Sequence, residues 1–255
     1  MHVFFIVLAR DAKGVKAKVE ELERFHYPYV VVCGEKTGLL NVVYRPLLGK
    51  YDAINFGSTF IPPDTDIVVL NDVDTEIHNF EVALAKFQNE NVSLVFTKVN
   101  VGLGPQLSFY SLLDSLRKRI PIAASGELML VKCQIMRSML PLRGCKAEDT
   151  YILFKILEKG EKVGFCEKCY VTTKRTTQAE QEEAYKRRTV GGIYQALSMS
   201  RPPLIVRLFY TILPFMSPLL LILGKKGFYW TKGILSGYID YRKGDRTASW
   251  RPTYT

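Results

Sequence analysis

The chain has 255 residues, of which 47% are hydrophobic and 24% are charged, and its formal net charge is +10. This length can bury a sizeable core, and it suits one globular domain with an appendage or two small domains. The basic excess is concentrated between residues 201 and 255, where nine Lys or Arg stand against two Asp. A nucleic-acid-binding domain more often spreads such charge over one helix or sheet. Nucleic acid is therefore not an expected partner, and anionic lipid or a phosphorylated substrate is favoured.

The five cysteines show no disulfide framework, because their number is odd and their spacing is irregular. They favour a reducing compartment. Cys166 and Cys169 form a C-x-x-C pair, but the sequence has no second Cys or His pair at ligand spacing to complete a zinc site. The apolar run 3–8 is too short for a signal peptide, and Arg10-Asp11 follow it almost directly, so no signal peptide is expected.

The first third of the chain predicts a parallel sheet. Residues 3–8 form an apolar strand, 13–24 have the spacing of an amphipathic helix, and 29–33 form a second apolar strand. Strands separated by a helix pair in parallel through a crossover connection. Residues 39–44 predict a third strand. Lys50, after Gly49, either meets a phosphate or begins an ordinary solvated helix.

The stretch 66–75 contains a short buried strand, Ile67–Leu70, that leads into an acidic turn with Asp72 and Asp74. Ligands of open α/β sheets bind at the carboxyl ends of strands. Two carboxylates separated by one residue can share a hard divalent cation whose remaining ligands are phosphate oxygens. An Asp-x-Asp pair also occurs by chance in many loops, so the rest of the chain must decide between the two interpretations.

The remaining elements alternate between helical and strand patterns. Helical spacing is found in 79–89, 107–119, 151–158 and 180–196, and strand patterns are found in 92–97, 124–131 and 163–172. Asp149 precedes the third of these helices, and it is either the helix N-cap or a general base that takes a proton from an incoming hydroxyl. Lys186-Arg187-Arg188 either stabilise a bound diphosphate or form a solvated or lipid-facing basic surface.

Residues 204–224 are nearly all apolar and reach the length of roughly 20 residues that a membrane helix needs. Arg207, Pro214 and Pro218 interrupt the run, so an interfacial or re-entrant hairpin is the main alternative, and a core helix of a soluble domain is another. The aromatic residues between 227 and 241 are typical of a membrane–water boundary. The sequence thus predicts a globular domain in 1–196 and a membrane-associated helical region with a basic tail in 197–255.

Seven segments occur in an order and spacing that together point to one family. They are Leu8-Ala9-Arg10-Asp11, Gly49-Lys50 with Ala53 and Asn55, Asp72-Val73-Asp74-Thr75, Ser125-Gly126 with Lys132, Glu148-Asp149, Lys186-Arg187-Arg188 with Gly191-Gly192, and Trp250-Arg251-Pro252-Thr253. In these segments the chain resembles the family 2 glycosyltransferases. It departs from the family pattern at Cys33-Gly34-Glu35, where the family has Asp-Asp-Gly-Ser, and at Thr189, where it has Trp. The second departure favours a single sugar addition over a processive polymerase.

The resemblance implies an α/β chain with the GT-A fold, a Rossmann-like, mostly parallel mixed sheet with flanking helices, followed by C-terminal membrane-associated helices. It implies Asp149 as the catalytic base with Glu148 beside it, and Asp72 and Asp74 as ligands of Mg²⁺ or Mn²⁺. The residues it places on the nucleotide or donor are Ala9, Asp11, Glu35, Lys50, Asp72, Arg187 and Arg188, and those on the acceptor side are Gly126 and Trp250.

The activity that the resemblance implies is an inverting, metal-dependent transfer of a sugar from a UDP- or GDP-sugar to a hydroxyl or phosphate acceptor. The apolar C-terminal region favours a lipid or lipid-linked saccharide as acceptor, at a membrane and with the catalytic domain on the cytoplasmic side. Two alternatives stay open: a sugar-phosphate nucleotidyltransferase of similar fold, and a non-catalytic basic protein that binds membranes or nucleic acid. His78 would be a third metal ligand only if the turn after Asp74 becomes helical.

Overall fold

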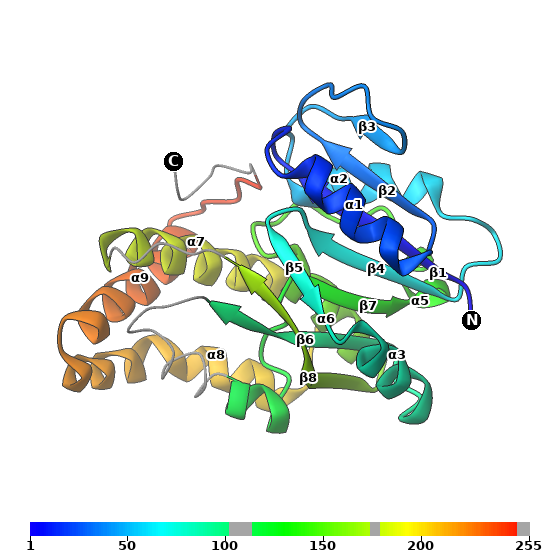
Figure 1. Cartoon of the computed structure of the whole chain (residues 1–255). Coiled ribbons are helices and arrows are strands. Elements are labelled where there is room, and N and C mark those ends of the chain that lie inside the picture. Colours follow the sequence, from blue (N-terminus) through cyan, green and yellow to red (C-terminus); the bar gives the residue numbers. More distant parts are fainter. Residues whose placement is uncertain (102–113, 174–178, 249–255) are drawn as a thin grey trace.

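In the part of the chain that the structure describes, eight strands form one mixed sheet in the order β3-β2-β1-β4-β7-β6-β8-β5 (Figure 1). The structure is a computed structural model, and it describes residues 1–101, 114–173 and 179–248. The strands are β1 Val3–Ala9, β2 Tyr29–Cys33, β3 Val42–Tyr44, β4 Ile67–Asp72, β5 Thr75–His78, β6 Leu94–Val101, β7 Leu128–Lys132 and β8 Val163–Thr173.

The predicted parallel start of the sheet is confirmed, because β1 pairs in parallel with both β2 and β4, and β2 pairs in parallel with β3. The other half is mixed. The pairs β4–β7, β6–β7 and β5–β8 are antiparallel, and β6–β8 is parallel. Since β7 runs against β4, with Asn71 opposite Leu128, the beginning of β7 lies beside the end of β4.

Helices cover both faces of the sheet (Figure 1). They are α1 Val15–Phe25, α2 Lys50–Gly57, α3 Phe80–Asn89, α5 Cys133–Arg137, α6 Glu148–Glu158, α7 Ala179–Ser198, α8 Leu204–Met216 and α9 Gly224–Arg242, with 3-10 turns η1 Ser58–Phe60 and η2 Ser217–Leu223. Side chains alternate between the faces of a strand. Phe4 and Ile6 of β1 therefore pack in the cluster that includes α2, α6, α7, α8 and α9, and Phe5 and Val7 pack in the cluster with α1 and α3.

Several predicted boundaries were wrong. The strand expected at 124–131 begins only at Leu128, because the small residues before it form a turn. The helix expected from residue 151 begins at Glu148, and its N-cap is Ala147, so Asp149 lies in the first turn and is not the cap. The strand expected at 39–44 is reduced to Val42–Tyr44. Of the helix expected at 107–119, the described part, 114–119, is helical.

The apolar run 204–224 is not one continuous helix. It divides into α8 and η2, and α9 begins at Gly224, which has φ 68°. Pro214 lies near the end of α8, and Pro218 lies in the first turn of η2. A proline removes a backbone donor and crowds the preceding turn, so two of them explain the change of helix type. Helix α9 then runs against α7 (Figure 1).

The core crosses the boundary expected between residues 196 and 197. Val206 and Tyr210 of α8 and Ile234 of α9 are buried in the same cluster as Phe154 of α6 and Phe96 of β6. The approach of α9 to α7 is close, because a Cβ at Gly237 would lie 2.5 Å from the carbonyl oxygen of Arg187. Only a residue without a side chain fits there.

Candidate active site

The polar residues singled out in the sequence converge at one edge of the sheet. The carboxyl ends of β1, β2 and β4 lie together there because these strands are parallel. The turn before β7 joins them, since β7 is antiparallel to β4. The first turn of α6 completes the edge, because Gly126 of that turn faces Asp149.

Hydrogen bonds close the acidic turn after β4. The Thr75 hydroxyl donates to the carbonyl oxygen of Asp72 at 2.8 Å. The amide of the buried Asn71 donates to the Thr75 hydroxyl at 2.9 Å and to the carbonyl oxygen of Glu127 at 2.5 Å. The turn is therefore held both within itself and to the start of β7. Asp74, at its tip, is exposed.

Lys50 lies between the two acidic segments. Its ammonium is 2.5 Å from Asp72 Oδ2 and 3.9 Å from Glu148 Oε1. Burial by itself would lower the pKa of Lys50, but Asp72 and Glu148 outweigh burial and raise it. The lysine thus stays charged and connects the acidic turn to the first turn of α6. Of the two interpretations open for Lys50, a solvated helix start is wrong, because its side chain is only 19% exposed.

The first turn of α6 presents a pair of carboxylates. Glu148 is buried, and Asp149 is partly buried with its Oδ1 accepting a hydrogen bond from the Thr150 N–H at 2.6 Å. Burial raises the pKa of both groups. Gly126 lies directly against Asp149, because a Cβ at Gly126 would be 3.0 Å from Asp149 Oδ2. A carboxylate with a raised pKa, at a helix start and beside a glycine turn, is well suited to accept a proton.

The electrostatics of this edge suit a divalent cation. Burial raises the pKa of Asp72 to about 6 although Lys50 lowers it, and the neighbouring Asp74 and Glu127 raise it further. A cation bound here would stabilise the charged form of this buried carboxylate. Carboxylate oxygens are the hard ligands that Mg²⁺ and Mn²⁺ prefer. Within the described ranges no three His, Cys, Asp or Glu side chains form a ready cluster, so Asp72 and Asp74 would share a cation with oxygens of a substrate.

Two residues of this region were missed in the sequence. Glu127 lies close enough to Lys50, Asp72 and Asp149 to affect the pKa of each. Its position directly after Ser125-Gly126 was the only available signal. Lys18 of α1 is buried beneath the acidic turn and donates a hydrogen bond to the carbonyl oxygen of Thr75.

The residues expected on the nucleotide lie at the ends of β1 and β2. Ala9 is the buried last residue of β1, and its carbonyl oxygen accepts the N–H of Gly34 at 3.0 Å. Glu35 is exposed and accepts the N–H of Ala12 at 3.0 Å. Asp11 accepts the N–H of Lys13 at 3.0 Å. The two loops are thus tied together beside the acidic turn, since Val73 N–H donates to Leu8 at the end of β1.

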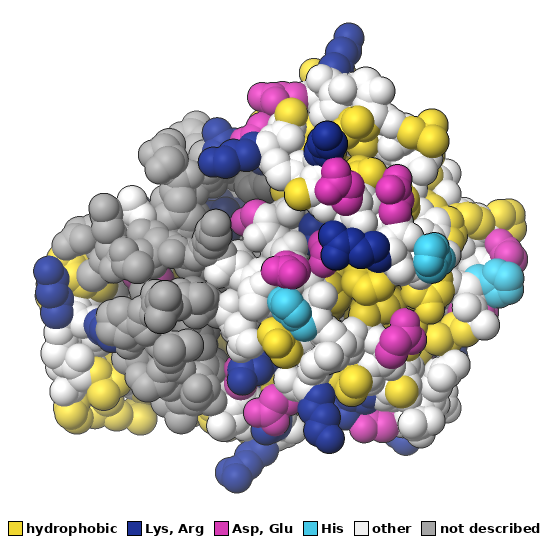
Figure 2. All heavy atoms as spheres, viewed as in Figure 1, with side chains coloured by type: hydrophobic (Ala, Val, Ile, Leu, Met, Phe, Trp, Pro, Cys, Tyr) yellow, Lys and Arg dark blue, Asp and Glu magenta, His cyan; other side chains and the backbone are white. Residues whose placement is uncertain are grey.

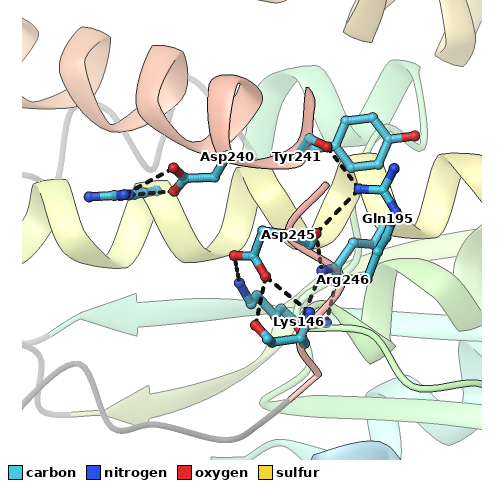
Figure 3. Close-up of polar contacts among 8 residues, drawn as sticks. Lys146, Gln195, Asp240, Tyr241, Asp245 and Arg246 are labelled. Carbon is cyan, nitrogen blue, oxygen red and sulfur yellow. Dashed lines mark hydrogen bonds and ion pairs between the residues drawn. The ribbon is translucent and has the colours of Figure 1, made fainter. Parts of the chain in front are cut away.

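The basic segment of α7 has a different setting. The Arg187 guanidinium makes a two-point pair with Asp240 of α9, at 2.5 and 2.9 Å (Figure 3). Arg188 is partly buried, and its Nε has no hydrogen-bond partner in the described part of the chain. Their contact with a diphosphate remains a prediction. Trp250 lies outside the described residues.

The segment after α9 lies beside the start of α6 (Figure 3). Lys146 Nζ is 2.5 Å from Asp245 Oδ2, and the Gln195 amide donates to the carbonyl oxygens of Asp245 and Thr247 at 3.2 Å each. The carbonyl oxygen of Ala248 then lies close to Gly49, where a Cβ would be 2.7 Å from it. The end of the described chain therefore borders the residue before Lys50.

His78 and Lys132 both lie away from the acidic turn. His78 lies in a strand and not in a helical turn, and its ring stacks on Tyr170 with 4.7 Å between centroids, so it does not join the acidic turn. Lys132, which belongs to the same family-like segment as Ser125-Gly126, lies opposite Ile67, at the end of β7 away from Gly126.

The fold, but not the sequence, is similar to known proteins. The sequence matches no protein-family model and no curated protein sequence. The structure is similar to the mannosyltransferase PcManGT from Pyrobaculum calidifontis, solved in complex with GDP-Man and Mn²⁺, with a TM-score of 0.69 and 15% identity over 96% of this chain and 88% of that one. It is also similar to M. tuberculosis glucosyl-3-phosphoglycerate synthase, with a TM-score of 0.52 and 14% identity over 79% of this chain and 81% of that one. The sheet, its flanking helices and these two likenesses together show that the chain has the GT-A fold of nucleotide-sugar glycosyltransferases.

Proposed function

We propose that this protein is a metal-dependent, inverting glycosyltransferase that moves a sugar from a nucleoside diphosphate sugar to an acceptor. The observation that carries the proposal is the meeting of the acidic turn, Asp72 and Asp74, with Asp149 and Gly126 at one edge of a GT-A sheet. The likeness to a mannosyltransferase solved with GDP-Man and Mn²⁺ supports it. Family 2 membership rests on the seven sequence segments.

The donor end of the site consists of carboxylates that need a cation before a diphosphate can bind. Asp72 and Asp74 would hold Mg²⁺ or Mn²⁺, which would neutralise the charge that develops on the leaving diphosphate. Lys50 fixes Asp72 from the other side and adds one positive charge. Ala9, Asp11 and Glu35 border the same edge and would contact the nucleoside, and Arg187 and Arg188 would approach the diphosphate from α7.

The acceptor end consists of Asp149 with Gly126 beside it. Asp149 would take the proton of the acceptor hydroxyl as its oxygen bonds to the anomeric carbon. The bond from that carbon to the diphosphate oxygen breaks, and its electron pair leaves with the diphosphate. Attack opposite the leaving group inverts the anomeric configuration. Glu148, buried and close to Lys50, would keep the lysine charged and in position.

The acceptor that fits the C-terminal region is a lipid or a lipid-linked saccharide, used at a membrane surface on the cytoplasmic side. The helices α8 and α9 follow the GT-A domain directly, and Leu204–Arg242 qualifies by length and composition as a membrane segment, since an 18-residue stretch of it has a mean hydropathy of 1.9. Part of this region packs in the core of the domain, but many apolar side chains of α8 and η2 are exposed. An acceptor held in the lipid would explain this exposure.

Calorimetry with UDP, GDP and their sugar conjugates, with and without Mn²⁺, tests the donor site. We expect one diphosphate to bind only with the cation, and Asp72→Ala/Asp74→Ala to lose this binding. Glu81→Gln/Glu90→Gln, which removes two exposed carboxylates at the start and just after the end of α3, is the control and should bind like the wild type. No binding of any of these donors would overturn the proposal, and release of pyrophosphate from a nucleoside triphosphate would indicate a nucleotidyltransferase instead.

A further inference from the structure

Helix α8 has two apolar faces. Val206, Tyr210 and Pro214 are buried against the domain. The opposite side and the following η2 expose large hydrophobic side chains, with exposed fractions of 75% for Leu204, 77% for Phe215 and 85% for Ile222. The other large exposed hydrophobic residues of these two elements are Ile205, Leu208, Ile212, Met216, Leu219, Leu221 and Leu223. A contiguous apolar surface of this kind marks a partner that is itself apolar.

The buried face of α8 is fixed to the GT-A domain by hydrogen bonds. Tyr210 Oη donates to the carbonyl oxygen of Ile122 at 2.7 Å, and Tyr194 Oη of α7 donates to the carbonyl oxygen of Tyr210 at 2.7 Å. Both tyrosines are buried. The helix therefore cannot leave the domain to stand across a bilayer without breaking these bonds and opening the core.

The path of the chain after η2 also argues against a membrane span. The 13 residues of α8 and the 7 of η2 together cover about 34 Å, at 1.5 and 2.0 Å per residue, so length alone would allow them to cross a hydrocarbon core of about 30 Å. After η2 the chain turns at Gly224, and α9 returns along α7 with its middle residues Thr231, Gly233 and Ile234 buried. The 39-residue segment that qualifies by composition is therefore bent back against the domain.

Basic side chains flank the apolar surface. Arg201 and Arg207 are exposed near the start of α8, and Lys225 is exposed and Lys226 partly exposed after η2. Figure 2 shows hydrophobic and basic side chains together at the end of the molecule that η2 and the start of α9 form in Figure 1. An apolar strip with lysines and arginines at its borders matches the boundary between acyl chains and anionic head groups. A second copy of this +10 chain would bring these basic groups against each other.

We infer that α8 and η2 lie in the plane of an anionic lipid surface and do not cross the bilayer. The side chains of Leu204, Leu208, Ile212, Phe215, Leu219 and Ile222 enter the acyl region, and the GT-A domain rests on them. This inference deepens the proposed function, since Tyr210 contacts Ile122, four residues before Gly126. The lipid surface then lies on the acceptor side of the site.

Sedimentation of the full chain with vesicles tests the inference. We expect binding to vesicles of phosphatidylcholine with phosphatidylglycerol, weaker binding to phosphatidylcholine alone, and a loss of about tenfold or more for Leu208→Glu/Ile212→Glu. The control is Leu40→Glu/Leu48→Glu, which charges two exposed leucines (84% and 54%) on the loops before and after β3 and should bind like the wild type. Equal loss in both variants, or no binding by the wild type, would overturn the inference.

Two measurements separate the remaining outcomes. Alkaline carbonate should release the full chain from membranes of expressing cells, and retention of the chain would show a membrane span. In analytical ultracentrifugation without lipid, the wild type and Leu208→Glu/Ile212→Glu should have the same oligomeric state. A wild-type dimer that this variant dissociates would instead show that a second copy of the chain covers the apolar surface. Donor calorimetry of the variant should be unchanged, so a failure of this inference is distinguishable from a failure of the transferase proposal.

Discussion

Lys18 of α1 donates a hydrogen bond to the carbonyl oxygen of Thr75, 57 residues later in the chain and directly after the acidic turn. The same ammonium is 2.6 Å from Glu21 Oε2, and Glu21 Oε1 accepts the N–H of Ile77 at 2.6 Å. The side chain of Lys18 is only 1% exposed. One helical turn of α1 thus holds both ends of the Thr75–Ile77 segment from behind the site.

We expect Lys18→Met to weaken donor binding and to destabilise the fold by about 2–4 kcal/mol, because it leaves Glu21 without its partner in a largely buried position. Urea unfolding and donor calorimetry with Mn²⁺ measure the two effects. Lys155→Met is the matched control, since the Lys155–Glu158 pair has the same spacing and the same 2.6 Å distance but is more exposed. It should cost less than about 1 kcal/mol and leave donor binding unchanged. Equal donor binding in Lys18→Met and the wild type would show that the pair serves stability alone.

The parts of the site that could be predicted are those with a local signal. Asp72 and Asp74 follow a strand of buried residues, and Asp149 lies at the start of a helix that the apolar spacing of 151–158 announces. Chain order alone places the ends of parallel strands at one edge. The parallel α/β start of the sheet followed from the same pattern, and the GT-A fold, which the family resemblance implied, is confirmed by the likeness to GT-A structures.

The parts that could not be predicted depend on contacts between distant segments. The antiparallel entry of β7 brings Glu127 to Asp72, and strand patterns do not specify pairing partners. Lys18 is buried because it lies on the apolar face of α1, between Val15 and Leu22. A charged residue on such a face indicates that it has a polar partner in the interior. The residue that would be its partner, Thr75, could be known only from the structure.

Gly126→Ala should slow sugar transfer without weakening donor binding. The added Cβ would lie 3.0 Å from both Cβ and Oδ2 of Asp149, so the carboxylate must move by a few tenths of an ångström. Small displacements of a catalytic group cost rate and not affinity. We expect a several-fold to hundredfold fall in kcat, measured with saturating donor, and unchanged calorimetry. Gly164→Ala is the control, because the closest atom to its Cβ would be at the flexible end of Lys86, at 3.1 Å, and the next contacts, at 3.6 and 3.7 Å, are ordinary ones. An unchanged kcat in Gly126→Ala would separate this glycine from the base.

The Arg187–Asp240 pair allows the predicted diphosphate contact to be separated from helix packing. Both Arg187→Met and Asp240→Asn remove the pair that joins α7 to α9, and since Arg187 is 53% exposed each should cost no more than about 1 kcal/mol in urea unfolding. If Arg187 serves the diphosphate, only Arg187→Met should raise the donor KM, by roughly tenfold, since Asp240→Asn leaves the guanidinium in place. A similar KM in the two variants would restrict Arg187 to its structural pair.

Asp149→Asn should abolish transfer and leave stability intact or improved. Loss of a general base costs about 10²–10⁴ in kcat, whereas the Asn side-chain oxygen can still accept the Thr150 N–H.

Burial raises the folded pKa of Asp149 above its unfolded value. The stability that this group contributes is therefore present below its unfolded pKa, near 4, and is lost as the pH rises through the folded pKa. The melting temperature of the variant relative to the wild type should therefore increase from pH 4 to pH 8. Transfer by the wild type should rise over the same range as Asp149 loses its proton. A variant with wild-type turnover, or one whose relative stability falls toward pH 8, would exclude Asp149 as a buried base and shift the search to the neighbouring carboxylates Glu127 and Glu148.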